Sequence, residues 1–321
     1  MRRLPTCLCG ILLLATLTLA GCGDQAAAPA TLPPSDAAQP PTALPGVDAT
    51  KAPRAAATGL SGVSDAFVVT VADLTAQVGD PHLRLVDMGS GDEYAAGHLP
   101  GAIHIDWTEL DLGDTQPSAV AAWQSRMSDL LGKRGIGDGD RVVVYDHGTL
   151  YDARLWWVLD QLGHAEKQIL NGGFAAWQGA GGTVEKPPVT LPAVIYSAHP
   201  QPAGLASKTE VEALLGQANT RLLDARSPGE YAAGHIPGAV NVPFTLTADG
   251  TPLLFKSPAD LHALFAAQGV TASTAAVTYC TTGVRGAVDY VALRRAGFAN
   301  VRLFTGSWAE WSRDPAGPVE K

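Results

Sequence analysis

Cysteine is scarce in this sequence: its 321 residues contain only four. Three of them, Cys7, Cys9 and Cys22, lie near the N-terminus, and Cys280 stands far from the others. If the leader is removed and Cys22 is acylated, as predicted below, no disulfide can form within one mature chain. Cys280 is then its single free thiol, which is either a small buried side chain or a reactive group.

Positive charge is scarce as well. The 22 Lys and Arg residues are outnumbered by 31 Asp and Glu, so the net charge is -9. This balance argues against nucleic acid or an anionic membrane surface as a partner. The length and the 46% of hydrophobic residues suffice for one large domain or two ordinary ones.

The N-terminus has the order of features of an export signal. Arg2 and Arg3 precede an apolar run at residues 11–20, which is too short to favour a membrane span. The run ends in Leu-Ala-Gly-Cys22, which resembles the lipobox of bacterial lipoproteins, where the cysteine is lipidated. We therefore expect a signal peptide at 1–21 and a protein anchored by lipid in the cell envelope, facing the periplasm. The alternative is a plain signal peptide with an incidental cysteine.

The rest of the chain divides into a spacer and a duplication. The segment after Cys22 is rich in Ala, Pro, Thr and Asp, as in disordered tethers. Beyond it, residues 87–105 match 224–242, and residues 141–177 match 275–311. The predicted parts are a tether (22–62), a first domain (63–180), a linker (181–206) and a second domain (207–315).

Strand and helix patterns alternate in each domain. In the second, Ser207 and Glu210 form a capping-box pattern before a helix, and four short apolar runs alternate with helical segments. This alternation predicts an α/β fold in which each domain is a parallel sheet with helices on both faces. Ligands bind such sheets at the carboxyl ends of strands. Cys280 follows the run AAVTY and stands at such an end.

The segment after Cys280 suits a thiolate. A turn from a strand end into a helix N-terminus offers free backbone N–H groups and the positive end of the helix dipole. We predict Cys280 as the catalytic nucleophile, in an active-site loop made of Thr281, Thr282, Gly283, Val284 and Arg285. Arg285 would add a positive charge or pin the loop.

These residues belong to a set of motifs that resembles the two-domain rhodanese-type sulfurtransferases. The motifs are Asp87 with GHLPGA, Asp224-Ala-Arg with GHIPGA, Cys280-Thr-Thr-Gly-Val-Arg, Gly306-Ser-Trp308, Ala153-Arg154-Leu-Trp-Trp157 and Asn171-Gly-Gly173. The resemblance implies tandem rhodanese-like domains and an enzyme that passes sulfane sulfur through a Cys280 persulfide. It implies a small sulfur donor and a thiol or cyanide acceptor as partners, with neither cofactor nor metal.

The first domain lacks the nucleophile, because Asp146 occupies the position of Cys280. We expect a catalytically silent domain that walls the cleft, with Asp146 as a solvated loop acid. Phosphatases of the same fold need five residues between the cysteine and the arginine to surround a phosphate. Here Thr281 to Val284 gives four, which favours sulfur.

The donor does not follow from the resemblance. Thiosulfate enzymes usually carry Arg and Lys after the cysteine, where this chain has Thr281 and Thr282. The carboxylate-binding arginine of mercaptopyruvate enzymes would fall at Glu230, so thiosulfate or a persulfide donor remains. Arg226 and Arg154 are possible substrate-binding cations or structural residues.

Three further expectations complete the sequence-based picture. His98 and His235 recur in both domains and are expected to be turn and packing residues. A binding or carrier lipoprotein without turnover is the main alternative to an enzyme, and the intact Cys280 loop favours the enzyme. A redox sensor is less favoured because no resolving cysteine is present in the mature chain.

Overall fold

The computed structural model describes residues 65–315 and 317–321. The predicted signal peptide, the lipidation site Cys22 and the tether lie outside these residues, so the structure does not bear on them. Within the described residues no helix is both long and apolar enough to cross a membrane.

The first domain is built on a five-stranded sheet in which every neighbouring pair is parallel, in the order β1-β5-β4-β2-β3. Alternate residues of β4 point to opposite faces, as expected for a strand covered on both sides. Val142 and Val144 pack with helices α3 and α4, and Val143 and Tyr145 pack on the other face, with α1 and α5. The elements are β1 (Val68–Val69), α1 (Val71–Thr75), β2 (Leu83–Asp87), α2 (Gly91–Ala96), β3 (Ile103–His104), η1 (Trp107–Leu110), α3 (Pro117–Lys133), β4 (Arg141–Tyr145), α4 (Asp152–Gln161), β5 (Lys167–Leu170) and α5 (Gly173–Gly179).

The second domain repeats this plan with a four-stranded parallel sheet in the order β11-β10-β6-β7. A single parallel bridge between Leu205 and Leu303 takes the place that β1 has in the first domain. The elements are η2 (Pro202–Gly204), α6 (Lys208–Leu214), β6 (Thr220–Asp224), α7 (Pro228–Ala233), β7 (Val240–Asn241), η3 (Phe244–Thr247), β8 (Ala248–Asp249), β9 (Leu254–Phe255), α8 (Pro258–Ala267), β10 (Ala275–Tyr279), α9 (Val284–Arg295), β11 (Val301–Leu303) and α10 (Ser307–Trp311).

Local sequence signals account for where these helices begin. Ser207 caps α6 and forms the predicted capping box with Glu210, and Ser227 does the same for α7 with Glu230. The predicted α/β fold, with parallel sheets covered on both faces, is confirmed. The short antiparallel pair β8–β9 was not among the expected elements.

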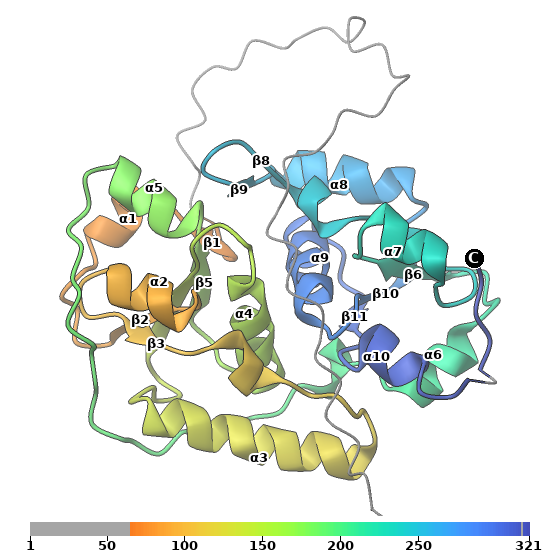
Figure 1. The fold of residues 1–321 in the computed structure, drawn as a ribbon, viewed down its shortest axis with the longest axis horizontal. Coiled ribbons are helices and arrows are strands. Elements are labelled where there is room, and N and C mark those ends of the chain that lie inside the picture. Colours follow the sequence, from red (N-terminus) through yellow and green to blue (C-terminus); the bar gives the residue numbers. More distant parts are fainter. Residues whose placement is uncertain (1–64, 316) are drawn as a thin grey trace, which may run out of the picture. The chain divides into compact units, whose positions relative to one another are not determined.

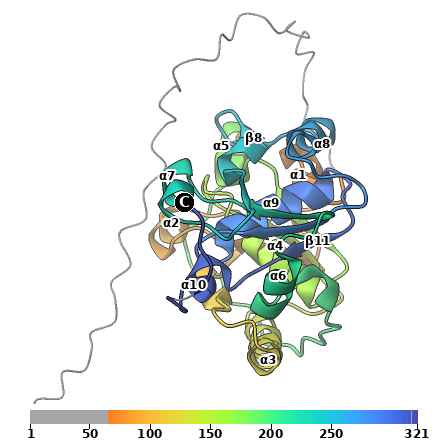
Figure 2. The same cartoon turned by 90° about the vertical axis from the view of Figure 1, so that its right-hand side faces the viewer.

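Helices α4 and α9 join the two domains (Figure 1), and they are neighbours again in the turned view (Figure 2). One continuous hydrophobic core includes residues of both helices, such as Trp157 and Val158 on α4 and Val288 and Val291 on α9. Both helices follow directly on the loops at the ends of β4 and β10. The domain contact therefore brings elements of the first domain close to Cys280.

Candidate active site

Cys280 lies at the carboxyl end of β10, where the sequence predicted it. Its side chain is buried, with 1% of its surface exposed, and it is the free cysteine found among the described residues. Its backbone N–H donates to Ser307 Oγ at 3.1 Å, and its carbonyl accepts from Trp308 N at 3.0 Å. The start of α10 therefore holds the cysteine backbone in place.

The loop bends back so that a backbone N–H points at the sulfur. Gly283 N donates to Cys280 Sγ at 3.1 Å, and α9 begins at the next residue. Gly283 has a φ of 90°, a left-handed conformation that favours glycine. A Cβ there would also lie 2.6 Å from the carbonyl oxygen of Thr305. The sulfur thus sits at the N-terminus of a 12-residue helix, which stabilises negative charge.

Arg285 pins this loop through an acid. Its guanidinium donates to both carboxylate oxygens of Glu230, at 2.8 and 2.7 Å, and to Thr281 Oγ1 at 2.7 Å. The Thr281 hydroxyl in turn donates to Glu230 at 3.1 Å. Burial alone would raise the pKa of Glu230, but hydrogen bonds from Arg285 and Ser227 lower it to about 2. We call Glu230, Arg285 and Thr281 the loop clamp.

The remaining loop residues add no unpaired charge beside Cys280. Val284 is buried, whereas Thr281 and Thr282 are only partly buried. The charge of Arg285 is already neutralised by Glu230. The loop itself therefore offers no unpaired positive charge to a substrate.

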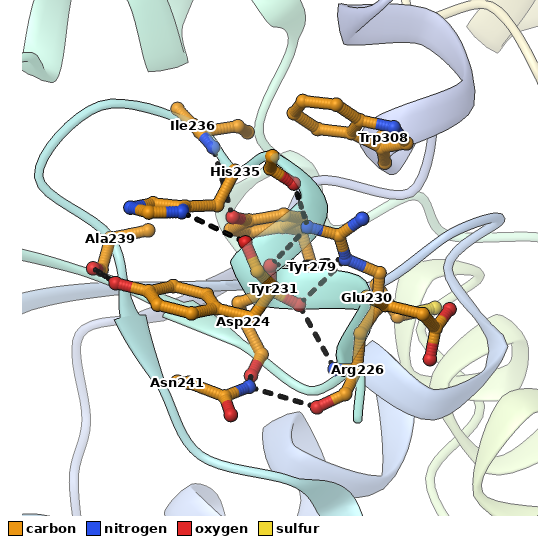
Figure 3. A network of polar contacts seen from close by, with 12 residues as sticks. Asp224, Arg226, Glu230, Tyr231, His235, Ile236, Ala239, Asn241, Tyr279 and Trp308 are labelled. Carbon is orange, nitrogen blue, oxygen red and sulfur yellow. Dashed lines mark hydrogen bonds and ion pairs between the residues drawn. The ribbon is translucent and has the colours of Figure 1, made fainter. Parts of the chain in front are cut away.

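Arg226 forms a buried ion pair beside the loop (Figure 3). Its guanidinium donates to both oxygens of Asp224 and to Gly234 O, and it lies 4.7 Å from the ring centre of Trp308. Asp224 is the register partner of Tyr279, the residue before Cys280. Arg226 is only 3% exposed. Its protein contacts give it a structural role at this strand end, and its predicted contact with substrate stays a prediction.

Arg154 reaches the site from the first domain. It is 1% exposed and donates from Nη1 to Thr305 Oγ1 at 2.7 Å and from Nη2 to Leu110 O at 3.1 Å. It lies next to the loop, because a Cβ on Gly283 would be 3.1 Å from Nη1. Substrate binding by Arg154 also stays a prediction.

Comparisons with known proteins agree with this geometry. The rhodanese-like domain family matches the chain twice, at residues 70–180 and 207–314. The chain belongs to the rhodanese family. It is 32% identical to a thiosulfate sulfurtransferase of Pseudomonas aeruginosa over 265 residues, covering 79% of this chain and 96% of the relative. It is 30% identical to a 3-mercaptopyruvate sulfurtransferase of Escherichia coli over 270 residues, covering 77% and 95%.

Solved structures show the same rhodanese fold. A crystal structure of the 3-mercaptopyruvate enzyme from Escherichia coli superposes with a TM-score of 0.69 at 28% identity, covering 77% of this chain and all of the other. An anaerobic ergothioneine biosynthesis enzyme from Chlorobium limicola superposes with a TM-score of 0.70 at 22% identity, over 79% of this chain and 70% of the other. The second likeness bears on the fold alone.

Tyr151 of the first rhodanese domain lies close enough to Cys280 to interact with its charge, although the sequence did not single it out. The rings of Trp107, in the same domain, and of Phe244, in the second domain, lie 6.3 and 6.4 Å from that of Tyr151, measured between centres. Burial raises the pKa of Tyr151, while the charge of Arg285 opposes this and that of Cys280 adds to it. Tyr151 follows the Asp146 loop, so only the packing of the two domains reveals its proximity.

The expectation that Asp146 is a solvated loop acid was wrong. It is 2% exposed, and its carboxylate accepts hydrogen bonds from Gly148 N at 2.8 Å, Thr149 N at 3.3 Å, Thr149 Oγ1 at 2.6 Å and Tyr151 N at 2.7 Å. The loop bends around its own side chain and satisfies it there. The first domain therefore keeps an anion-binding loop and fills it with a carboxylate.

The two histidines of the repeated turns are packing residues, as predicted. His98 and His235 are buried and stack on Tyr94 and Tyr231, with ring centres 4.2 and 3.7 Å apart. Neither lies among the residues described around Cys280. Over the ranges 65–315 and 317–321, no cluster of three or more His, Cys, Asp or Glu is placed to hold a metal.

Proposed function

We propose that this rhodanese-family enzyme moves sulfane sulfur from a small donor to a thiophilic acceptor through a persulfide on Cys280. The observation that carries the proposal is the Gly283 N–H aimed at the buried sulfur of Cys280 at 3.1 Å, at the start of α9. This arrangement stabilises a thiolate and, after reaction, a terminal persulfide anion held by the same loop.

The chemistry is two displacements at sulfur. With thiosulfate, the Cys280 thiolate attacks the outer sulfur, the S–S bond of the donor breaks, and sulfite leaves with the electron pair. Cyanide or a thiolate then attacks the terminal sulfur of the persulfide and regenerates the Cys280 thiolate. Electrons balance without an external oxidant or reductant, and the scheme requires ping-pong kinetics.

The charges beside Cys280 bear on the choice of donor. Glu230 occupies the position of a carboxylate-binding arginine and is locked to Arg285, which argues against mercaptopyruvate. Relatives at 30 to 32% identity are named for thiosulfate and for 3-mercaptopyruvate, so homology supports either. We propose thiosulfate or a persulfide as donor. A comparison of kcat/KM for thiosulfate, 3-mercaptopyruvate and glutathione persulfide tests this.

We further propose that the enzyme is lipid-anchored through Cys22 and faces the periplasm. The proposal rests on the order of the basic pair, apolar run and Leu-Ala-Gly-Cys22 in the sequence. Anchoring would place sulfur transfer at the membrane surface of the cell envelope. Fractionation of cells tests it, since Cys22→Ser should move the protein out of the membrane fraction.

Two cysteine substitutions distinguish the proposed nucleophile, Cys280, from the proposed lipid attachment site, Cys22. Incubation with thiosulfate should add one sulfur atom to the intact wild-type protein, and cyanide should then release it as thiocyanate. Cys280→Ser should abolish both, whereas Cys22→Ser, the same change at the other thiol, should retain both. Thiocyanate formation by Cys280→Ser at the wild-type rate would refute the proposed nucleophile.

A further inference from the structure

Arg154 is a buried cation that no described carboxylate pairs with. Its two hydrogen bonds go to neutral acceptors, the hydroxyl of Thr305 and the carbonyl of Leu110. Its Nε is buried and finds no acceptor, and within residues 65–315 and 317–321 no ion pair includes it. Its guanidinium also lies 4.8 Å from the ring centre of Trp157. A buried guanidinium without a counter-ion is costly, so a negative charge close by would be stabilised.

The Cys280 loop of the second domain also lies next to Arg154. The space next to Gly283 Cα, where a Cβ would stand, is 3.1 Å from Arg154 Nη1. The N–H of the same Gly283 donates to Cys280 Sγ. The guanidinium therefore adjoins the residue whose backbone N–H contacts the sulfur.

The other cations near the sulfur are already neutralised. Arg285 is paired with Glu230, and Arg226 is paired with Asp224. Glu310 on α10 is buried and accepts hydrogen bonds from Thr115, so it adds negative charge to this region. Tyr151, another titratable group near Cys280, has a raised pKa, mainly because it is buried, and stays neutral.

The electrostatics of Arg154 agree with this geometry. Burial lowers the pKa of Arg154 to about 10, and two negative groups oppose that effect, first Asp111 and then Cys280. Asp111 is exposed, so solvent screens its charge. Cys280 is buried beside Arg154, where charges interact more strongly.

We propose that Arg154, supplied by the first domain, is the counter-ion of the Cys280 thiolate and of the persulfide formed on it. It acts from beside the loop as a positioning residue and does not touch the donor. The thiolate part of this inference stands on the structure alone, and the persulfide part rests on the function proposed above.

The test is the pH dependence of Cys280 alkylation in the full chain, followed on the Cys280 peptide by mass spectrometry. The midpoint of the wild type is the reference for the variants. Arg154→Gln should raise the midpoint by about one unit or more, because a nearby opposite charge is lost. Arg154→Lys, which keeps the charge, should recover part of that shift.

A matched control removes a positive charge elsewhere in the second domain. Arg302 on β11 pairs with the partly exposed Glu210, and Arg302→Gln should leave the midpoint unchanged. A folded Arg154→Gln with the wild-type midpoint would overturn the inference. If that variant does not fold, Thr305→Val decides: it removes the hydrogen bond that holds Nη1 beside Gly283 and should shift the midpoint by a smaller amount, and no change would overturn the inference.

The same measurements separate this inference from the proposed function. If Arg154→Gln raises the midpoint but the wild-type protein transfers no sulfur, the function is contradicted and the role of Arg154 stands. Normal sulfur transfer together with identical midpoints in wild type and Arg154→Gln contradicts only the role of Arg154.

Discussion

The loop after β4 and the loop after β10 have the same course but surround different side chains. Both leave a parallel strand, curl around one side chain and enter a helix, but the first closes around the Asp146 carboxylate and the second around the Cys280 sulfur. Four donor groups satisfy Asp146, whereas a single backbone N–H is directed at Cys280 Sγ. An anion-binding loop filled by its own carboxylate is complete, and one built around a thiol can take up a further sulfur atom.

The aspartates at the neighbouring strand ends, Asp87 and Asp224, also bind different partners in the two domains. In the first domain Asp87 binds His147, a loop residue, at 3.1 Å. Burial alone would lower the pKa of His147, but Asp87 raises it. In the second domain Asp224 binds Arg226, so the equivalent loop residue, Thr281, is left to the loop clamp. The loop of the first domain is thus tied to its own sheet, and the loop of the second domain is tied to α7.

The strongest way to break this comparison is to convert one loop into the other. Cys280→Asp places a carboxylate at the N-terminus of α9, where Gly283 N–H can bind it and Arg154 can balance its charge. We expect complete loss of persulfide formation, measured by the mass of the intact protein. We also expect a free energy of unfolding at least equal to that of Cys280→Ser.

Stability therefore decides whether the loops are equivalent. Chemical denaturation of both variants gives the comparison. If Cys280→Asp were less stable than Cys280→Ser by more than about 1 kcal/mol, the shorter loop could not hold a carboxylate, and its resemblance to the Asp146 loop would be superficial.

A substitution that weakens the Asp146 loop should lower the free energy of unfolding and leave persulfide formation on Cys280 intact. Asp146→Asn removes the negative charge and replaces one acceptor oxygen by a donor, so at least one of the loop N–H groups loses its partner. We expect a loss of about 2 kcal/mol in the free energy of unfolding, since hydrogen bonds to charged groups contribute about 1.5–3 kcal/mol. Equilibrium denaturation at neutral pH measures it.

An exposed acid of the same domain is the control. Asp129 on α3 is exposed, and Asp129→Asn should change stability by less than about 0.5 kcal/mol. Equal stabilities of the two variants would mean that the buried carboxylate does not hold the Asp146 loop together. Persulfide formation on Cys280 should survive in both variants.

The parts of this comparison that were predictable from sequence are those set by local signals. The apolar run before Cys280 and the capping box at Ser207 act over a few residues, so the positions of a strand and a helix followed from them. The internal duplication aligned Asp146 with Cys280. No neighbour in the sequence, however, indicates that a loop acid will be buried by its own backbone.

The contacts that sequence reasoning missed join residues distant along the chain. Arg285 binds Glu230 from 55 positions away, and Arg154 binds Thr305 from 151 positions away. Arg285 was predicted to add charge or pin the loop, and the structure shows that it pins. The sequence analysis noted Glu230 only because it stands where related enzymes have a substrate-binding arginine. Neither motif indicates that the fold brings Glu230 and Arg285 together.

The loop clamp should give the smallest of the expected effects, and the first domain contains a matched control for Glu230. Glu93 caps α2 with Ser90 as Glu230 caps α7 with Ser227, and no described arginine binds Glu93. Glu230→Gln should lower kcat for sulfur transfer by about tenfold, because an unpinned loop displaces the nucleophile. Glu93→Gln makes the same change in a capping box without an arginine and should leave kcat unchanged.

The pH dependence of stability tests the ionised form of Glu230, which Arg285 and Ser227 both stabilise. The pKa of Glu230 is lowered to about 2 in the fold from an ordinary 4.5, so its stabilisation is fully present above about 4.5 and is lost as the pH falls toward 2. The difference in unfolding free energy between wild type and Glu230→Gln should therefore shrink over that window, and a constant difference would contradict the lowered pKa. An equal effect of Glu93→Gln and Glu230→Gln on kcat would reduce Glu230 to a helix cap and mean that its bond to Arg285 does not hold the active-site loop.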